Sequence, residues 1–262
     1  MTEPVLVEIA NAVATITLNR PDAMNSLDTT AKVALRDAVL TVATDDGVRC
    51  VVVTGTGRAF CVGQDLREHA AMLDDNSGDI ASTVREHYAP ICAALATMGK
   101  PVVAAVNGVA AGAGACIAFA CDVRLVADTA GFNLAFASIG LSCDTGASWT
   151  LPRLVGHGRA VELLMMPRTV PAAEALALGL ATRVVPAADL ATETAVLAAQ
   201  LAAGPTLAYG ALRRSVAYAE SHSLEESLGY EADMMHLTGG TQDHRDAVRS
   251  FLTKSTPTFH GR

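Results

Sequence analysis

Several residue types and patterns that point to particular functions are scarce in this 262-residue chain. Phe, Trp and Tyr together make up 4% of it, which argues against a surface that stacks bases. The net charge is −8 and no basic stripe is present, so nucleic acid is not expected as a partner. No uncharged apolar run reaches the length that spans a bilayer, so no membrane partner is expected either.

The cysteines and histidines lack the spacings of common metal and redox sites. None of the six cysteines forms a C-x-x-C pair and the seven histidines show no H-x-x-x-H spacing, so no metal site is expected. There is no G-x-S-x-G motif, which argues against the nucleophile elbow of serine hydrolases. The N-terminal segment MTEPVLVEIA is acidic and has no basic part typical of a signal peptide. Free thiols and no visible targeting segment predict a cytoplasmic protein.

Apolar residues are abundant by contrast, at 51% of the chain, which is enough for a sizeable core. The length suits one large domain or a domain with a small appendage. Strands and helices alternate up to about residue 185, and only helices follow from residue 189. The sequence therefore predicts an α/β core over residues 1–188 and a C-terminal helical region over residues 189–262.

The expected elements follow from hydrophobic periodicity and turn residues. Strands are expected at 5–9, 13–18, 50–53, 101–106, 123–127 and 182–185. One helix is expected after a cap at Ser26 or Asp28, and another at 80–98 with a kink at Pro90. Further helices are expected at 116–121, 171–179, 189–202, 206–220, 224–237 and 242–253. Residues 74–79 are expected to form a polar loop and residues 131–148 an irregular stretch.

The interpretation centres on residues 100–122, KPVVAAVNGVAAGAGACIAFACD. A strand that leads through small residues into a helix leaves backbone N–H groups free, and these suit an anion or a developing oxyanion. A tight strand–helix crossover with no ligand explains the stretch equally well. A dinucleotide site is disfavoured, because Ile117 stands where the third glycine of G-x-G-x-x-G belongs.

Asp144 is the second candidate, because it is the only acid between Asp128 and Glu162 and lies among apolar and small residues. Its residue type and its place ahead of a probable helix favour an N-cap role. The functional alternative is a general acid or base in an apolar pocket, where burial would raise its pKa toward the working range.

Three separated stretches resemble the enoyl-CoA hydratase/isomerase (crotonase) superfamily: NRPDAMNSL at 19–27, GRAFCVGQDL at 57–66 and AAVNGVAAGAGACIAFACD at 104–122. LPRLVG at 151–156 and FLTK at 251–254 extend the resemblance over nearly the whole chain. It implies a spiral of ββα units, C-terminal helices that build a homotrimer or homohexamer, and an acyl-CoA thioester as ligand. It implies no separate cofactor, because coenzyme A is part of the substrate.

The resemblance also implies roles for particular residues. The backbone N–H groups of Val62 and Ala113 would bind the thioester oxygen as it becomes an enolate. Phe251 and Lys254 would contact the coenzyme A nucleotide bound by a neighbouring subunit. The remaining implied coenzyme A contacts are Ala23, Gly63, Gln64, Asp65 and Leu66.

The departures from the family pattern narrow the expected activity. The two catalytic glutamates of true hydratases fall at Cys116 and Phe136, and neither residue can activate water. Asp144 falls where several isomerase and dehalogenase branches keep an aspartate. The chain most resembles the 2-(1,2-epoxy-1,2-dihydrophenyl)acetyl-CoA isomerases of phenylacetate breakdown, with Ser142-Cys143 replacing the usual Ile-Pro. The resemblance therefore implies an acyl-CoA isomerase. The alternatives are a hydratase of fatty-acid oxidation with displaced residues, and a non-catalytic acyl-CoA-binding homologue.

Overall fold

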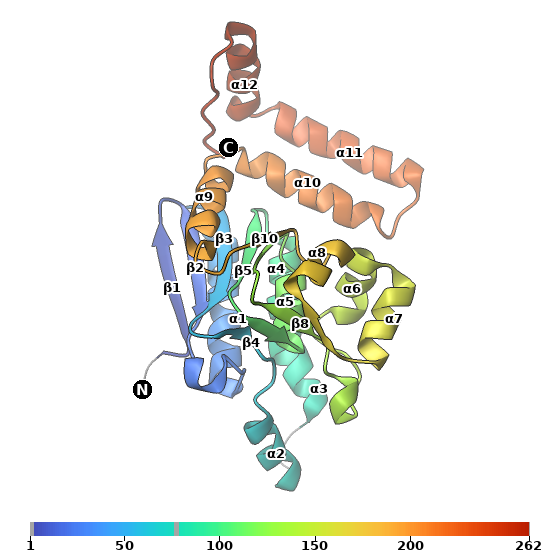
Figure 1. The fold of residues 1–262 in the computed structure, drawn as a ribbon. Coiled ribbons are helices and arrows are strands. Elements are labelled where there is room, and N and C mark those ends of the chain that lie inside the picture. Colours follow the sequence, from blue (N-terminus) through green and yellow to red (C-terminus); the bar gives the residue numbers. More distant parts are fainter. Residues whose placement is uncertain (1–2, 76–78, 262) are drawn as a thin grey trace.

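The computed structural model describes residues 3–75 and 79–261, and it arranges them around two sheets (Figure 1). The large sheet has the strand order β1 (Val5–Ala10), β2 (Val13–Leu18), β3 (Cys50–Gly55), β5 (Val102–Val106), β7 (Val123–Ala127), β10 (Arg183–Val185). The small sheet has the order β4 (Ala59–Cys61), β6 (Val109–Ala111), β8 (Gly131–Asn133), β9 (Thr169–Pro171). The pairs β1–β2 and β8–β9 are antiparallel, and the other neighbours are parallel. The predicted α/β class is confirmed.

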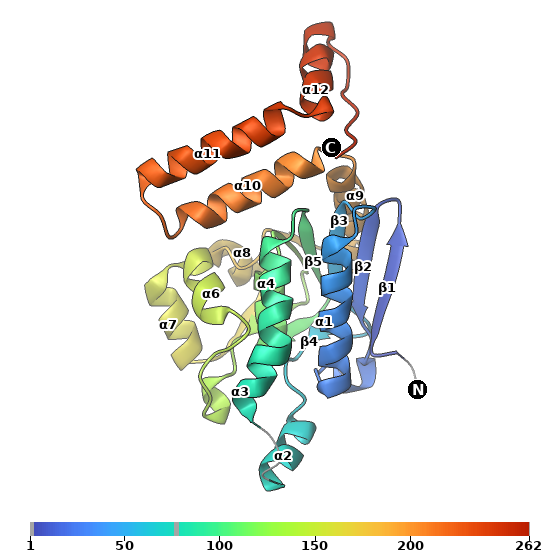
Figure 2. The same cartoon turned by 180° about the vertical axis from the view of Figure 1, so that it is seen from behind.

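Helices cover both faces of the large sheet (Figures 1 and 2). Helices α1 (Thr29–Thr44) and α4 (Ala89–Thr97) pack together on one face, and α9 (Leu190–Ala202) packs on the other. This double cover explains why β5 is buried along its whole length and reads as an unbroken apolar run. Asp28, rather than Ser26, caps α1, because its carboxylate accepts the Ala31 N–H at 2.8 Å.

The helix expected at 80–98 is interrupted. It consists of α3 (Ile80–Thr83), a π-helical turn η2 (Val84–Tyr88) and α4. Pro90 lies in the first turn of α4, where a missing N–H breaks no helical hydrogen bond. The wide turn ends at Tyr88, which is buried, and π turns of this kind are frequent at functional sites. Within the predicted loop at 74–79, residues 76–78 lie outside the described residues.

The central stretch forms β5, a turn, β6 and then α5 (Ala113–Phe119). Helix α5 begins at Ala113 rather than at Cys116, because Gly112, with φ of +50°, makes the turn that starts it. The expectation of irregular structure over 131–148 is wrong in part, since this stretch contains β8, the 3₁₀ turn η3 (Ala137–Ile139) and the start of α6 (Ala147–Val155). A three-residue strand such as β8 is specified by its neighbours and not by its own pattern.

The other helices are α2 (Leu66–Asp74), α7 (His157–Met165) and α8 (Ala172–Leu178). Pro171 belongs to β9 and caps α8 rather than lying inside it, so the helix expected at 171–179 begins one residue later. Gly179 ends α8 with φ of +85°, as predicted from its residue type.

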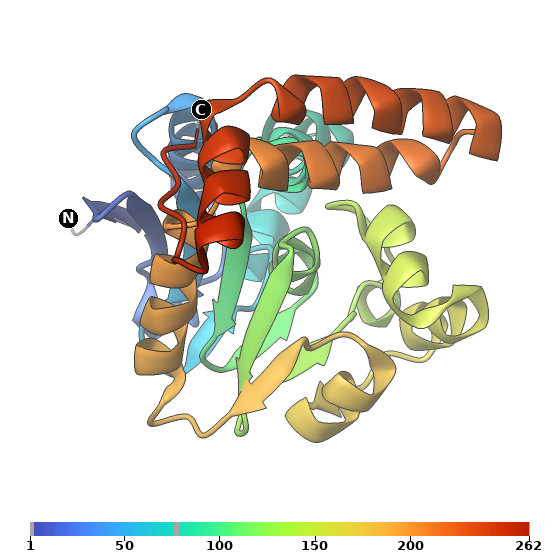
Figure 3. The same cartoon turned by 90° about the horizontal axis from the view of Figure 1, so that it is seen from above.

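The C-terminal region is helical, as predicted. Helices α10 (Thr206–Ala219) and α11 (Leu224–Gly239) pack side by side, away from the sheets, and α12 (Gln242–Thr253) follows (Figure 3). The tail then returns to the core, where the Asp243 carboxylate accepts the N–H groups of His260 and Gly261 at 2.7 and 2.8 Å. Among the described helices, none is by itself long and apolar enough to cross a bilayer. Helices α9 and α10 satisfy that criterion only when taken together across a 97° bend.

Candidate active site

Two glycine-containing turns pack against each other: the loop that follows β4 and the turn at the start of α5. Gly63 has φ of +83°, and a Cβ at this position would lie 3.1 Å from the backbone nitrogen of Ala113. Gly114 packs so closely on the backbone of Cys61 that a Cβ there would overlap it. These contacts bring the Val62 loop and the first turn of α5 side by side, although they are far apart in the sequence.

Val62 and Ala113 supply backbone N–H groups at this junction. Ala113 is the first residue of α5, so its N–H has no partner within the helix. The Val62 N–H donates to the Met24 carbonyl at 3.3 Å, which is long for such a bond. Two donors at one place form the type of oxyanion hole that binds a thioester oxygen, provided that this oxygen replaces Met24 at Val62.

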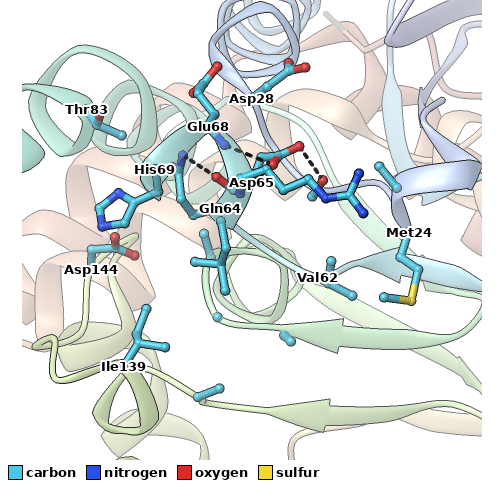
Figure 4. Close-up of a pocket in the computed structure, with 18 of the residues that line it drawn as sticks. Met24, Asp28, Val62, Gln64, Asp65, Glu68, His69, Thr83, Ile139 and Asp144 are labelled. Atoms are coloured by element: carbon cyan, nitrogen blue, oxygen red, sulfur yellow. Dashed lines mark hydrogen bonds between the residues drawn. The ribbon is translucent and has the colours of Figure 1, made fainter. Parts of the chain in front are cut away.

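A cavity of about 780 Å³ opens beside this junction (Figure 4). That volume lies in the usual range for small-molecule sites. Val62 and Ala113 line it, together with Asp144 and His69. Its apolar wall comes from Met72, Ile80, Val84, Phe136, Ile139 and Leu141. The cavity therefore combines hydrogen-bond donors, several acids that include Asp144, and an apolar chamber.

The position of Asp144 decides between the two interpretations of this residue. Helix α6 has Gly146 as its N-cap, and no side chain of the described residues caps it. The Asp144 carboxylate instead lines the cavity and accepts a hydrogen bond from Thr145 Oγ1 at 2.8 Å. Burial raises its pKa, and the bond from Thr145 only partly opposes this. The N-cap interpretation is wrong, and a raised pKa suits a group that takes up and returns a proton.

Gln64 belongs to a buried network in the cavity wall. Its Oε1 accepts from the Tyr88 hydroxyl at 2.7 Å and from Lys32 Nζ at 3.3 Å. Lys32 is fully buried, and its anionic neighbour is Glu68 at 3.4 Å. Burial raises the pKa of Tyr88, and the charge of Asp144 raises it further, so Tyr88 stays neutral. One amide oxygen thus holds both a buried cation and a buried hydroxyl.

This network predicts a stability effect at Gln64. Gln64→Ala leaves the Lys32 ammonium and the Tyr88 hydroxyl without their shared acceptor, which we expect to lower the free energy of unfolding by about 2–4 kcal/mol. Gln64→Glu keeps an acceptor oxygen in place and serves as the control. Urea denaturation measures both variants. Equal, small losses in the two variants would contradict a role for the amide oxygen as the shared acceptor.

Asp65 anchors the loop that carries the oxyanion hole. Its carboxylate accepts from Arg20 Nη2 at 3.1 Å and from Ser26 Oγ at 3.0 Å, and it caps the first turn of α2. Burial alone would raise the pKa of Asp65, but these hydrogen bonds hold it below its usual value. Leu66 and Ala23 line the cavity near it. Their roles as coenzyme A contacts stay predictions.

Phe251 and Lys254 lie on and just after α12 (Figure 1), and neither is among the residues that line the cavity. The Phe251 side chain is 82% exposed, and Lys254 ends the helix with φ of +55°. The structure does not bring either residue to the cavity of its own chain. Their predicted coenzyme A contact therefore requires a second copy of the chain.

The two residues at the hydratase glutamate positions are both buried. Cys116 lies in α5, and burial raises the pKa of its thiol well above the usual value, so it stays neutral. Phe136 contributes its ring to the cavity wall. Neither supplies a proton acceptor at the pH of ordinary assays.

Three residues of the site were not predicted from the sequence. Lys32 carries a detectable signal, because it shares the inward face of α1 with Leu35 and Val39 at helical spacing. A lysine at such a position requires a buried partner. Tyr88 and His69 carry no local signal, and only the fold places them in the cavity wall.

The chain is similar in sequence to a known family over nearly its whole length. The family model described as enoyl-CoA hydratase/isomerase matches residues 8–262. The chain is 37% identical over 262 residues to the 1,2-epoxyphenylacetyl-CoA isomerase of Escherichia coli (strain K12), covering 100% of both. It is 39% identical over 255 residues to a probable enoyl-CoA hydratase of Rhodobacter capsulatus, covering 97% of both.

A solved structure is equally similar. The crystal structure of a putative enoyl-CoA hydratase/isomerase from Mycobacterium abscessus matches with a TM-score of 0.95 at 39% identity, covering 98% of this chain and 100% of that one. The crotonase fold that the motifs imply is confirmed by this match.

Proposed function

Because the chain belongs to the enoyl-CoA hydratase/isomerase family, we propose that it is an acyl-CoA isomerase that acts on an enoyl-CoA-type thioester. The observation that carries the proposal is the state of the acids in the cavity. Asp65 is held by Arg20 and Ser26, and Glu68 by Thr29 and Lys32. Asp144 is half-buried, accepts its side-chain hydrogen bond from its neighbour Thr145, and is the acid of the cavity lining whose pKa is raised.

In its simplest form, the proposed reaction needs one proton carrier and an oxyanion hole. Asp144 removes a proton from the carbon next to the thioester, and the C–H electron pair moves into an enolate whose oxygen is bound by Val62 and Ala113. Each such donor contributes about 3–4 kcal/mol in acyl chemistry. Delivery of the proton to a carbon further along the conjugated chain moves the double bond and restores the carboxylate. Hydration would instead need a base and an acid acting together on water.

The acyl group is proposed to be bulky or cyclic. The Escherichia coli relative is named for an epoxyphenylacetyl thioester, and the apolar wall of the cavity is suited to a ring. Turnover of a ring-epoxide thioester and of a linear 3-enoyl-CoA, compared at equal enzyme concentration, tests this. Faster turnover of the linear substrate would contradict the proposed preference.

We expect very weak hydration of short enoyl-CoA esters, because Cys116 and Phe136 stand where hydratases carry glutamates. The measurement is the loss of crotonyl-CoA absorbance beside an isomerisation assay on the same preparation. Fast hydration would support the hydratase alternative that the Rhodobacter capsulatus relative's name suggests. Tight acyl-CoA binding without turnover of any of these substrates would support the non-catalytic alternative.

We also propose that the chain assembles into a homotrimer or a dimer of trimers. The C-terminal helices expose several large apolar side chains: Leu212, Val216, Leu228, Met235, Phe251 and Leu252. Exposed apolar clusters of this kind mark contact surfaces. Sedimentation at micromolar concentration should give three or six times the chain mass, and a monomer would contradict the proposal. The cytoplasmic location and the absence of a separate cofactor stay predictions.

A further inference from the structure

His69 is a titratable residue in the cavity that the proposed shuttle does not use. Figure 4 shows its imidazole pointing toward the carboxylate of Asp144, and both side chains line the cavity. The Asp144 carboxylate accepts its hydrogen bond from Thr145, its chain neighbour, at 2.8 Å, so its bonding does not involve the imidazole. We propose that His69 is a second proton-transfer residue, which acts on the acyl group from α2, while Asp144 acts from the loop before α6.

The backbone that leads into His69 is fixed by the two acids that precede it, Asp65 and Glu68. Asp65 caps α2 and is held by Arg20, as described above. Glu68, the residue before His69, accepts the Thr29 N–H at 2.9 Å and pairs with the buried Lys32 at 3.4 Å. The first turn of α2 is therefore tied to the start of α1. A proton carrier has to be held in place by such contacts if it is to meet the same carbon at each turnover.

The chemistry follows from the position of the two groups and rests on the proposed isomerase function. Asp144 takes the proton from the carbon next to the thioester, and the C–H pair moves into a dienolate. The protonated imidazole of His69 donates a proton to the γ-carbon, where a dienolate electron pair forms the new C–H bond. Asp144 is then a neutral acid and His69 a neutral base. Transfer of the proton from Asp144 to His69 restores both groups, with no net gain or loss of atoms or electrons.

Histidine suits the second role, because it is the side chain that changes charge between pH 5 and 8 in ordinary surroundings. With Asp144 removing one proton and His69 adding another, the site acts on two different carbons without moving the substrate.

The test separates proton removal from proton delivery. In D₂O, exchange of the α-hydrogen of a saturated acyl-CoA requires Asp144 and the oxyanion hole, whereas isomerisation of a 3-enoyl-CoA also requires delivery at the γ-carbon. We expect His69→Gln to keep the exchange rate within about twofold and to lose about 10²-fold in isomerisation kcat, a typical size for a general acid. The matched control is His157→Gln, on the exposed face of α7, which should change neither rate.

Each other outcome has a definite meaning. If exchange and isomerisation fall together in His69→Gln, the residue has only a structural role and the proposal is overturned. Unchanged isomerisation in that variant overturns it as well. If the wild-type protein exchanges the α-hydrogen but does not isomerise any 3-enoyl-CoA, the proposed function fails, and His69 fails with it as a γ-carbon donor. Binding of the saturated acyl-CoA, measured by calorimetry, should be equal in all variants.

Discussion

Asp144→Asn should lose about 10²–10⁴-fold in kcat for isomerisation while it keeps acyl-CoA binding. This range is the usual contribution of a general acid–base group, and the amide cannot take up the proton. The cavity position of the side chain, the burial that raises its pKa and its absence from the cap of α6 all support this size of effect. The measurement is kcat and KM for a 3-enoyl-CoA in both forms.

The same variant should not lose stability, because the direction of the Asp144 pKa shift gives the sign of the stability change. The pKa of Asp144 is higher in the folded chain than in the unfolded one, so the folded state binds the proton more tightly. Ionisation of the carboxyl therefore costs stability as the pH rises from about 4, the ordinary value, through the folded pKa. Asn carries no charge, so Asp144→Asn should have a Tm equal to or above that of the wild type at pH 7. The difference should vanish at low pH.

Two outcomes would count against this assignment. Unchanged kcat in Asp144→Asn would remove Asp144 from the reaction and leave the non-catalytic alternative or another base. A Tm that falls by several degrees together with kcat would mean that the carboxylate has a structural role that the described hydrogen bonds do not show.

Gly63→Ala should lower both activity and stability. Its φ of +83° is costly for alanine, and the added methyl group would lie 2.8 Å from the Ala111 carbonyl oxygen and 3.1 Å from the Ala113 nitrogen. The Val62 loop and the start of α5 would have to move apart, which widens the oxyanion hole. Loss of one well-placed donor costs about 10²–10³-fold in kcat, and the strain should remove about 1–3 kcal/mol of stability.

Gly156→Ala is the matched control for this prediction. Gly156 has φ of +78°, close to that of Gly63, but a methyl group there meets nothing within 4 Å. Both variants should lose stability from backbone strain, and only Gly63→Ala should lose kcat. Equal kcat in the two variants would show that the close packing of Gly63 on Ala113 does not set the position of the donors.

The elements with strong local signals could be predicted from the sequence, as particular cases show. The hairpin of β1 and β2, a helix cap at Ser26 or Asp28, which the structure assigns to Asp28, and the helix stop at Gly179 all follow from residue types at fixed spacings. The sequence motifs indicated the family, and the family implied the fold. By contrast, β8 and the π turn before Pro90 were missed, because both are set by contacts with distant segments.

The sequence by itself determined the apolar core, the strands of the large sheet with the C-terminal helices, and the glycines that allow two turns to touch. It also showed that the hydratase glutamates are replaced, since residue identity alone decides that. Only the tertiary structure decided that Asp144 faces the cavity instead of capping α6, that Gln64 holds Lys32 and Tyr88, and that His69 points toward Asp144. The physical reason is that burial and hydrogen-bond partners depend on which distant segments meet. A local sequence pattern does not specify those meetings.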